Sequence, residues 1–103
     1  MEVYAWPSAV DFRYPVPHAV PDYHTIIAHP MSLSDIQRKL HELHYSSLSA
    51  FMSDIRLMAS NAAKFNGRDS YLAINANKIV QHLQSRIDYD STHQLRDLLR
   101  ELE

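Results

Sequence analysis

The sequence predicts an all-α domain built as a bundle of four helices. Apolar residues recur every three or four positions over most of the chain after residue 32, which is the spacing of one helix face. The chain has one Gly in 103 residues, and it is rich in residues that favour helix. Its 46% hydrophobic content is ordinary for a globular protein. Because each apolar face must be buried against another, we expect residues 1–103 to form one helical domain.

The helix pattern has recognisable starts and stops. Four stretches carry it: residues 33–43, 48–65, 70–87 and 91–102. Ser32 or Ser34 can cap the first, with Gln37 three residues after Ser34 as in a capping box. Ser47 can cap the second, and Asn66-Gly67 is expected to end it because both residues tolerate the left-handed conformation.

A long loop, residues 6–31, is expected to precede the first of these helices. Trp6-Pro7 should turn the backbone toward an extended form, and Pro21 and Pro30 bias the residues before them away from helix. Three side chains of this loop are expected to turn inward: Tyr23, Ile26 and Ile27. So long a loop in a compact domain is typically functional, and its aromatic content favours that reading.

Charge and composition exclude several classes of function. The net charge is −2 and the basic residues are scattered, so we expect no direct binding of nucleic acid. Cysteine is missing from the sequence, which excludes disulfides and thiolate chemistry. No apolar run approaches the length of a membrane span, and the first residues do not resemble a signal peptide. We expect a soluble chain with no membrane partner.

The sequence shows no motif for catalysis or for a cofactor. There is no nucleophile elbow or zinc helix motif, and one Gly does not suffice for a phosphate-binding loop. His41 and His44 are three residues apart, yet neither a cysteine nor a convincing third ligand accompanies them. We therefore expect no catalytic residue, no metal and no cofactor.

The segment VPDYHTIIAHPM, from Val20 to Met31, is answered further along the chain by Lys64-Phe65-Asn66. A P-D-Y followed by I-I-x-x-P-M, a short helix, and a second helix ending in an aromatic-Asn pair occur in the same order in bromodomains. From Trp6 to about Ile87 the chain resembles that family. The resemblance implies a left-handed four-helix bundle with a long first loop that binds acetylated lysine without catalysis.

The order of the helices departs from the family. Bromodomains place a long amphipathic helix before the Trp-Pro pair, where this chain has five residues. The leucines of residues 91–102 have the missing pattern, and they continue in register through Val3 and Trp6. Our hypothesis is a circularly permuted bundle, monomeric, whose last helix fills the place of the first. The alternatives are a helix that leaves the domain and a swapped dimer.

The resemblance also assigns a binding site. Acetylated lysine is a neutral amide that needs an apolar slot with few polar groups, because an unpaired buried polar group costs about 1–3 kcal/mol. Asn66 matches the family's asparagine, whose amide donates to the acetyl carbonyl, and Tyr23 matches the tyrosine that reaches this carbonyl through a water. Three residues match the apolar wall: Val20, Phe65 and Leu72. Leu72 corresponds to the residue at the mouth, with Tyr71 as the alternative if the turn is wound differently.

Two departures concern the Trp6-Pro7 end of this site, which the resemblance places beside the pocket. The family usually has Phe next, at the pocket floor, and this chain has Ser8. A gapless count puts Phe12 at the position of a wall valine, with Val10 or Val16 as other candidates. We therefore expect a wetter floor and an altered wall. No carboxylate belongs to the assigned set, so free lysine should be refused.

The function that the resemblance implies is the recognition of acetylated histone tails or other acetylated peptides, in the nucleus, for chromatin targeting. The alternative is a degenerate bromodomain that acts as an interaction or dimerisation scaffold. A third class, a helical interaction domain unrelated to acetyl-lysine, would not depend on Asn66 or Tyr23.

Overall fold

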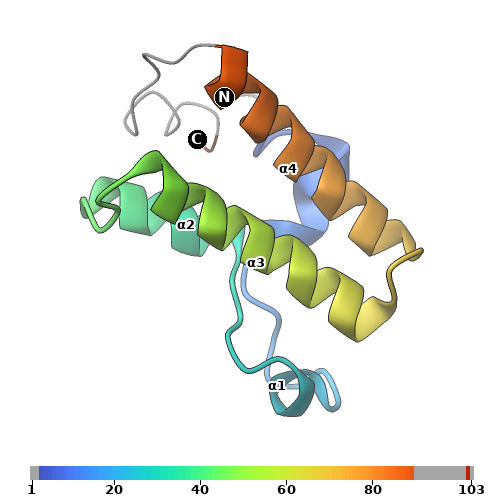
Figure 1. Cartoon of the computed structure of the whole chain (residues 1–103). Coiled ribbons are helices and arrows are strands. Elements are labelled where there is room, and N and C mark those ends of the chain that lie inside the picture. Colours follow the sequence, from blue (N-terminus) through green and yellow to red (C-terminus); the bar gives the residue numbers. More distant parts are fainter. Residues whose placement is uncertain (1–2, 90–101, 103) are drawn as a thin grey trace.

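The computed structural model describes residues 3–89 and Leu102, and the described residues are helical without any strand. The elements are a 3₁₀ helix η1 (Pro7–Phe12) and four α-helices: α1 (Tyr23–Ile26), α2 (Leu33–His41), α3 (Leu48–Asn66) and α4 (Tyr71–Tyr89). Figure 1 shows the two long helices α3 and α4 packed together, with η1 against α4 and α2 against α3. The predicted all-α class is confirmed.

The three helices expected at residues 33–43, 48–65 and 70–87 are present as α2, α3 and α4, with ends shifted by at most two residues. The helix expected at residues 91–102 lies outside the described residues except for Leu102. The permuted order of helices thus stays a hypothesis.

Residues near both ends of the chain belong to one core. Phe51 and Ile55 of α3 and Ile79 of α4 are fully buried in it. Val3 and Leu102 are also fully buried and belong to the same cluster. The side-chain amide of Gln37 donates to the carbonyl of Leu102 at 2.7 Å, which ties α2 to that residue.

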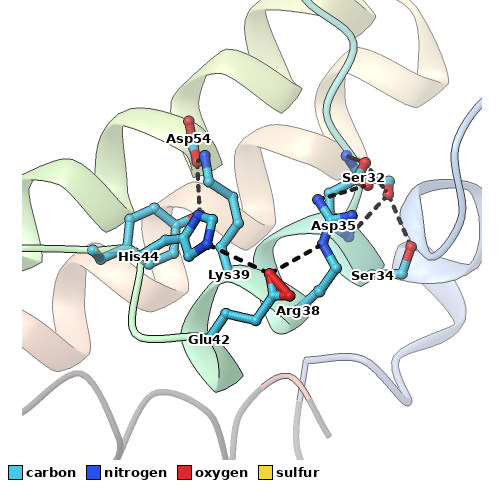
Figure 2. Close-up of polar contacts among 9 residues, drawn as sticks. Ser32, Ser34, Asp35, Arg38, Lys39, Glu42, His44 and Asp54 are labelled. Carbon is cyan, nitrogen blue, oxygen red and sulfur yellow. Dashed lines mark hydrogen bonds and ion pairs between the residues drawn. The ribbon is translucent and has the colours of Figure 1, made fainter.

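The first turn of α2 is fixed by Ser32 and Asp35. The Asp35 amide donates to the Ser32 hydroxyl oxygen at 3.3 Å, and the Ser32 amide donates to the Asp35 carboxylate at 3.0 Å. Together these bonds form a capping box, and Figure 2 shows them at the start of α2. Ser32 is therefore the cap, and Gln37, expected to close a box with Ser34, instead bonds to Leu102.

The long loop contains two short helices that the proline pattern did not predict. Trp6 is extended as expected, but Pro7 opens η1, because the fixed φ of proline suits the first position of a helix. The helix α1 begins after Asp22, which has a positive φ of 64°. The expectation for Ile26 was wrong: it is 40% exposed, whereas Tyr23 and Ile27 are buried.

A polar cluster joins α2 to α3. The Asp54 carboxylate accepts hydrogen bonds from Lys39 Nζ and from the Tyr45 hydroxyl, each at 2.6 Å (Figure 2). Burial, and then this bond, raise the pKa of Tyr45 from its usual value near 10. The folded chain therefore holds the phenol proton to higher pH than the unfolded chain does. The protonated Tyr45 contributes fully to the free energy of unfolding below the unfolded pKa of about 10, and this contribution is lost progressively as the pH rises above that value.

Leu43, just after α2, combines a φ of 58° with a side chain that is 88% exposed. A left-handed conformation costs a residue with a Cβ about 1–2 kcal/mol, and glycine avoids that cost. We expect Leu43→Gly to raise the free energy of unfolding by about 0.5–1 kcal/mol, after allowance for the greater entropy of glycine in the unfolded chain. Urea titration measures the change. Leu43→Ala removes the same exposed atoms and keeps the Cβ, so an equal gain in that variant would contradict the explanation.

Candidate functional site

A cavity lies between the long loop and the two long helices. It holds about 420 Å³ of space not filled by protein atoms, part of which is open solvent. Ten residues line it: Asp11, Phe12, Tyr14, Val16, Tyr23, Met31, Met58, Ala62, Asn66 and Leu72.

The buried residues that line the cavity are apolar, and its outer edge is formed by exposed residues with polar groups. Met58 and Ala62, on the same side of α3, are buried, as is Phe12 from η1. Asp11 and Tyr14 are exposed. A ligand with an apolar stem and a neutral polar group can therefore be largely enclosed, while any charged neighbour stays at the edge.

Asn66 is the last residue of α3, and the turn after it fixes its place at the cavity. Gly67 ends the helix with a φ of 99°, and its amide donates to the carbonyl of Ala63 at 2.8 Å. The Nδ2 atom of Asn66 donates to the carbonyl of Ala62 at 3.2 Å. Since a side-chain amide carries two hydrogens, one donor remains for a ligand.

Tyr23 brings the other polar group from α1. Its ring packs edge-on against Phe65, with centroids 4.8 Å apart, so Phe65 supports the tyrosine. Burial raises the pKa of Tyr23 above its usual value near 10. The hydroxyl is thus protonated at neutral pH and can serve as a donor.

Two hydrogen bonds hold the loop that carries Tyr23. The Ser34 amide donates to the carbonyl of Arg13 at 2.9 Å, which closes the segment between residues 13 and 34 at its base. Nearer the site, the side-chain amide of Asn61 on α3 donates to the carbonyl of His29 at 2.9 Å. Sequence reasoning missed Asn61, although it is a polar residue on the apolar face that carries Met58 and Phe65.

The structure brings together four of the eight residues assigned by resemblance. Asn66, Tyr23, Leu72 and Phe12 line the cavity. Four others are not among the described residues that line it: Trp6, Pro7, Val20 and Phe65. The Trp6 ring instead packs edge-on against His82, with centroids 4.8 Å apart.

The departures expected near Trp6-Pro7 take a different form. Ser8 is not among the lining residues, whereas Phe12 and Val16 are, so an aromatic ring and a valine both reach the cavity. Leu72 lines the cavity, whereas the alternative Tyr71 is not among its lining residues and is 73% exposed. The assigned set lacked a carboxylate, but Asp11 supplies one at the cavity.

Two further expectations concern a metal site and a membrane-spanning helix. Within residues 3–89 and Leu102, no three His, Asp or Glu side chains gather as a metal site would require. None of the helices in this part of the chain has the length and apolar character needed to cross a membrane.

Comparison with known proteins assigns the family. The model of the bromodomain family matches residues 2–78, which is most of the chain. The chain belongs to the bromodomain family. Bromodomains are non-catalytic modules that read acetylated lysine in chromatin proteins.

Relatives of this bromodomain carry the name E3 ubiquitin-protein ligase TRIM33. The Danio rerio protein is 46% identical over 94 residues, covering 88% of this chain and 8% of that protein. The Xenopus laevis and Homo sapiens proteins are each 37% identical over 67 residues, covering 62% of this chain and 6% of theirs. The chain thus spans less than a tenth of the length of these curated relatives.

Proposed function

We propose that this bromodomain binds acetylated lysine in peptides, above all in histone tails, and that Asn66 and Tyr23 hold the acetyl group. The observation that carries the proposal is the composition of one cavity, whose lining residues include both Asn66 and Tyr23 together with the buried residues Met58, Ala62 and Phe12. The lysine methylenes fit a floor of such apolar residues, and the acetyl carbonyl needs the donor that Asn66 has free.

The two polar residues divide the work on the acetyl group. Asn66 Nδ2 donates directly to the acetyl carbonyl, and its oxygen accepts from the acetamide N–H. The Tyr23 hydroxyl reaches the same carbonyl through a bridging water, a contact nearly as favourable in enthalpy as a direct one. An unmodified lysine would have to place a desolvated ammonium on the apolar floor, which is costly.

In this proposal the bromodomain acts in the nucleus as a monomer that targets its protein to acetylated chromatin, without a cofactor. A single small pocket captures little area, so we expect weak binding by one site and avidity when several marks or modules act together. The names of the TRIM33 relatives describe whole proteins, and ubiquitin transfer is not proposed for this domain.

The test is a two-dimensional NMR titration with acetylated histone-tail peptides and their unacetylated twins. We expect shifts at Asn66, Tyr23 and Leu72 that require the acetyl group. Asn66→Ala should weaken binding about tenfold or more, because the buried acetyl amide loses its partner. Asn77→Ala makes the same change at an exposed site on α4 and should bind like the wild type.

A folded wild-type protein that shows no acetyl-dependent shift at millimolar peptide would refute the reader function. That result would favour the alternative, a bromodomain scaffold for other protein contacts. Acetyl-dependent binding that survives Asn66→Ala unchanged would refute the role of Asn66 alone.

A further inference from the structure

Asp11 and Tyr14 form the exposed edge of the cavity. Asp11 lies in the last turn of η1, and Tyr14 follows the end of that helix. Asp11 carries the only formal charge among the ten residues that line the cavity. Within the described part of the chain, no hydrogen bond or ion pair engages its carboxylate. With respect to the described residues, the carboxylate is therefore available to a charged group outside the protein.

Tyr14 adds an aromatic ring to the lining of the same cavity. Its side chain is 67% exposed. The Tyr14 hydroxyl interacts with the Tyr4 side chain, and this interaction raises the pKa of Tyr4. An aromatic ring as exposed as that of Tyr14 is suited to stacking with a planar cation.

The nearest cation in the sequence is already engaged. Arg13 donates from Nε to the carbonyl of Tyr4 at 2.7 Å, and its guanidinium lies 5.3 Å from the centre of the Tyr4 ring. Beyond Asn66, the turn to α4 carries Arg68 and Asp69, whose opposite charges largely cancel at a distance. Among the residues that line the cavity, no opposite charge offsets that of Asp11.

We propose that this edge selects acetyl-lysine peptides in which an arginine is adjacent to the acetylated residue, with its guanidinium paired to Asp11 and stacked on Tyr14. This inference rests on the proposed function, since the acetyl-lysine itself occupies the cavity. Neighbouring peptide residues have Cα atoms about 3.8 Å apart, so the side chain next to acetyl-lysine emerges at the edge. Guanidinium suits the pair better than ammonium, because it is planar, stacks on aromatic rings and offers two parallel donors to a carboxylate.

The test measures the affinity of the whole chain for two series of four acetyl-lysine peptides by isothermal titration calorimetry. The residue beside acetyl-lysine, placed before it in one series and after it in another, is arginine, citrulline, lysine or glutamate. Citrulline keeps the shape of arginine without its charge. In at least one series, arginine should bind about two- to fivefold more tightly than citrulline, as for an exposed ion pair, and the difference should shrink at high salt.

Three variants assign the preference to residues. Asp11→Asn should make the arginine and citrulline peptides equal while acetyl-dependent binding persists. Asp22→Asn changes an exposed aspartate of the same loop that does not line the cavity, and it should keep the preference. Tyr14→Leu should reduce the preference for arginine over lysine.

The outcomes separate this inference from the function on which it rests. If the wild type binds acetylated peptides in an Asn66-dependent way but treats arginine and citrulline alike, only this inference falls. It also falls if the preference survives Asp11→Asn. If no peptide binds in an acetyl-dependent way, the proposed function and this inference fall together.

Discussion

Replacing Ala62 with leucine is expected to weaken acetyl-lysine binding by about ten- to hundredfold while the domain stays folded. Ala62 is buried on α3 and lines the inner end of the cavity, so a longer side chain there occupies the ligand's place. A ligand kept out of an apolar floor forgoes about 1.5–3 kcal/mol, the value of burying one apolar side chain, which gives this range. Calorimetry with an acetylated peptide measures the loss.

The design separates blocking from unfolding. The added carbons enter existing space, so the melting temperature of Ala62→Leu should stay close to that of the wild type. Ser60→Leu places the same side chain at an exposed position of α3, and its binding should be unchanged. Undiminished binding by a folded Ala62→Leu variant would mean that acetyl-lysine does not use this cavity.

Asp54→Ala is expected to lower the free energy of unfolding by about 2–3 kcal/mol, the largest effect on stability predicted here. The change leaves two partly buried donors, Lys39 Nζ and the Tyr45 hydroxyl, without the carboxylate to which each donates at 2.6 Å. Removing one partner of such a group costs more than the bond contributes, because the remaining polar atoms stay desolvated. A fall in melting temperature of roughly 10 °C or more is the corresponding measurement.

Asp54→Asn is the matched control. It keeps the shape and one acceptor oxygen, so it should lose clearly less stability than the alanine variant. Binding of acetylated peptide by either variant, measured well below its melting temperature, should match the wild type, since Asp54 does not line the cavity. Equal stability of the alanine variant and the wild type would show that the cluster does not stabilise the junction of α2 and α3.

The helices α2, α3 and α4 were predictable because their determinants are local. Apolar spacing located α2, α3 and α4, and Asn66-Gly67 indicated where α3 ends. Local chemistry was less decisive where two residues could do one job: Ser32 and Ser34 were both possible caps, and the choice depends on Asp35. Proline was misread at η1, since Pro7 can begin a helix as well as prevent one.

Site residues that belong to a sequence motif could be predicted. Site residues whose positions depend on the path of the loop could not. Tyr23 and Asn66 were located by resemblance, and the structure brings both to one cavity. Counting without gaps from Trp6-Pro7 gave no account of Asp11 or Tyr14, and it left Val16 as one of three candidates for the wall. These loop residues have no periodicity, and their positions follow from distant contacts such as the bond from Asn61 to His29.

The anchored loop has a consequence for the divergence of such domains. The hydrogen bond from the Ser34 amide to the Arg13 carbonyl closes the loop at its base. Near α3, the loop is held by the bond from Asn61 to the backbone carbonyl of His29 rather than to a side chain. Bonds to backbone carbonyls place little demand on which residue supplies the carbonyl. Exposed residues between these anchors can therefore be exchanged while the helices keep their packing, so mutation can alter ligand preference without first having to rebuild a foldable domain.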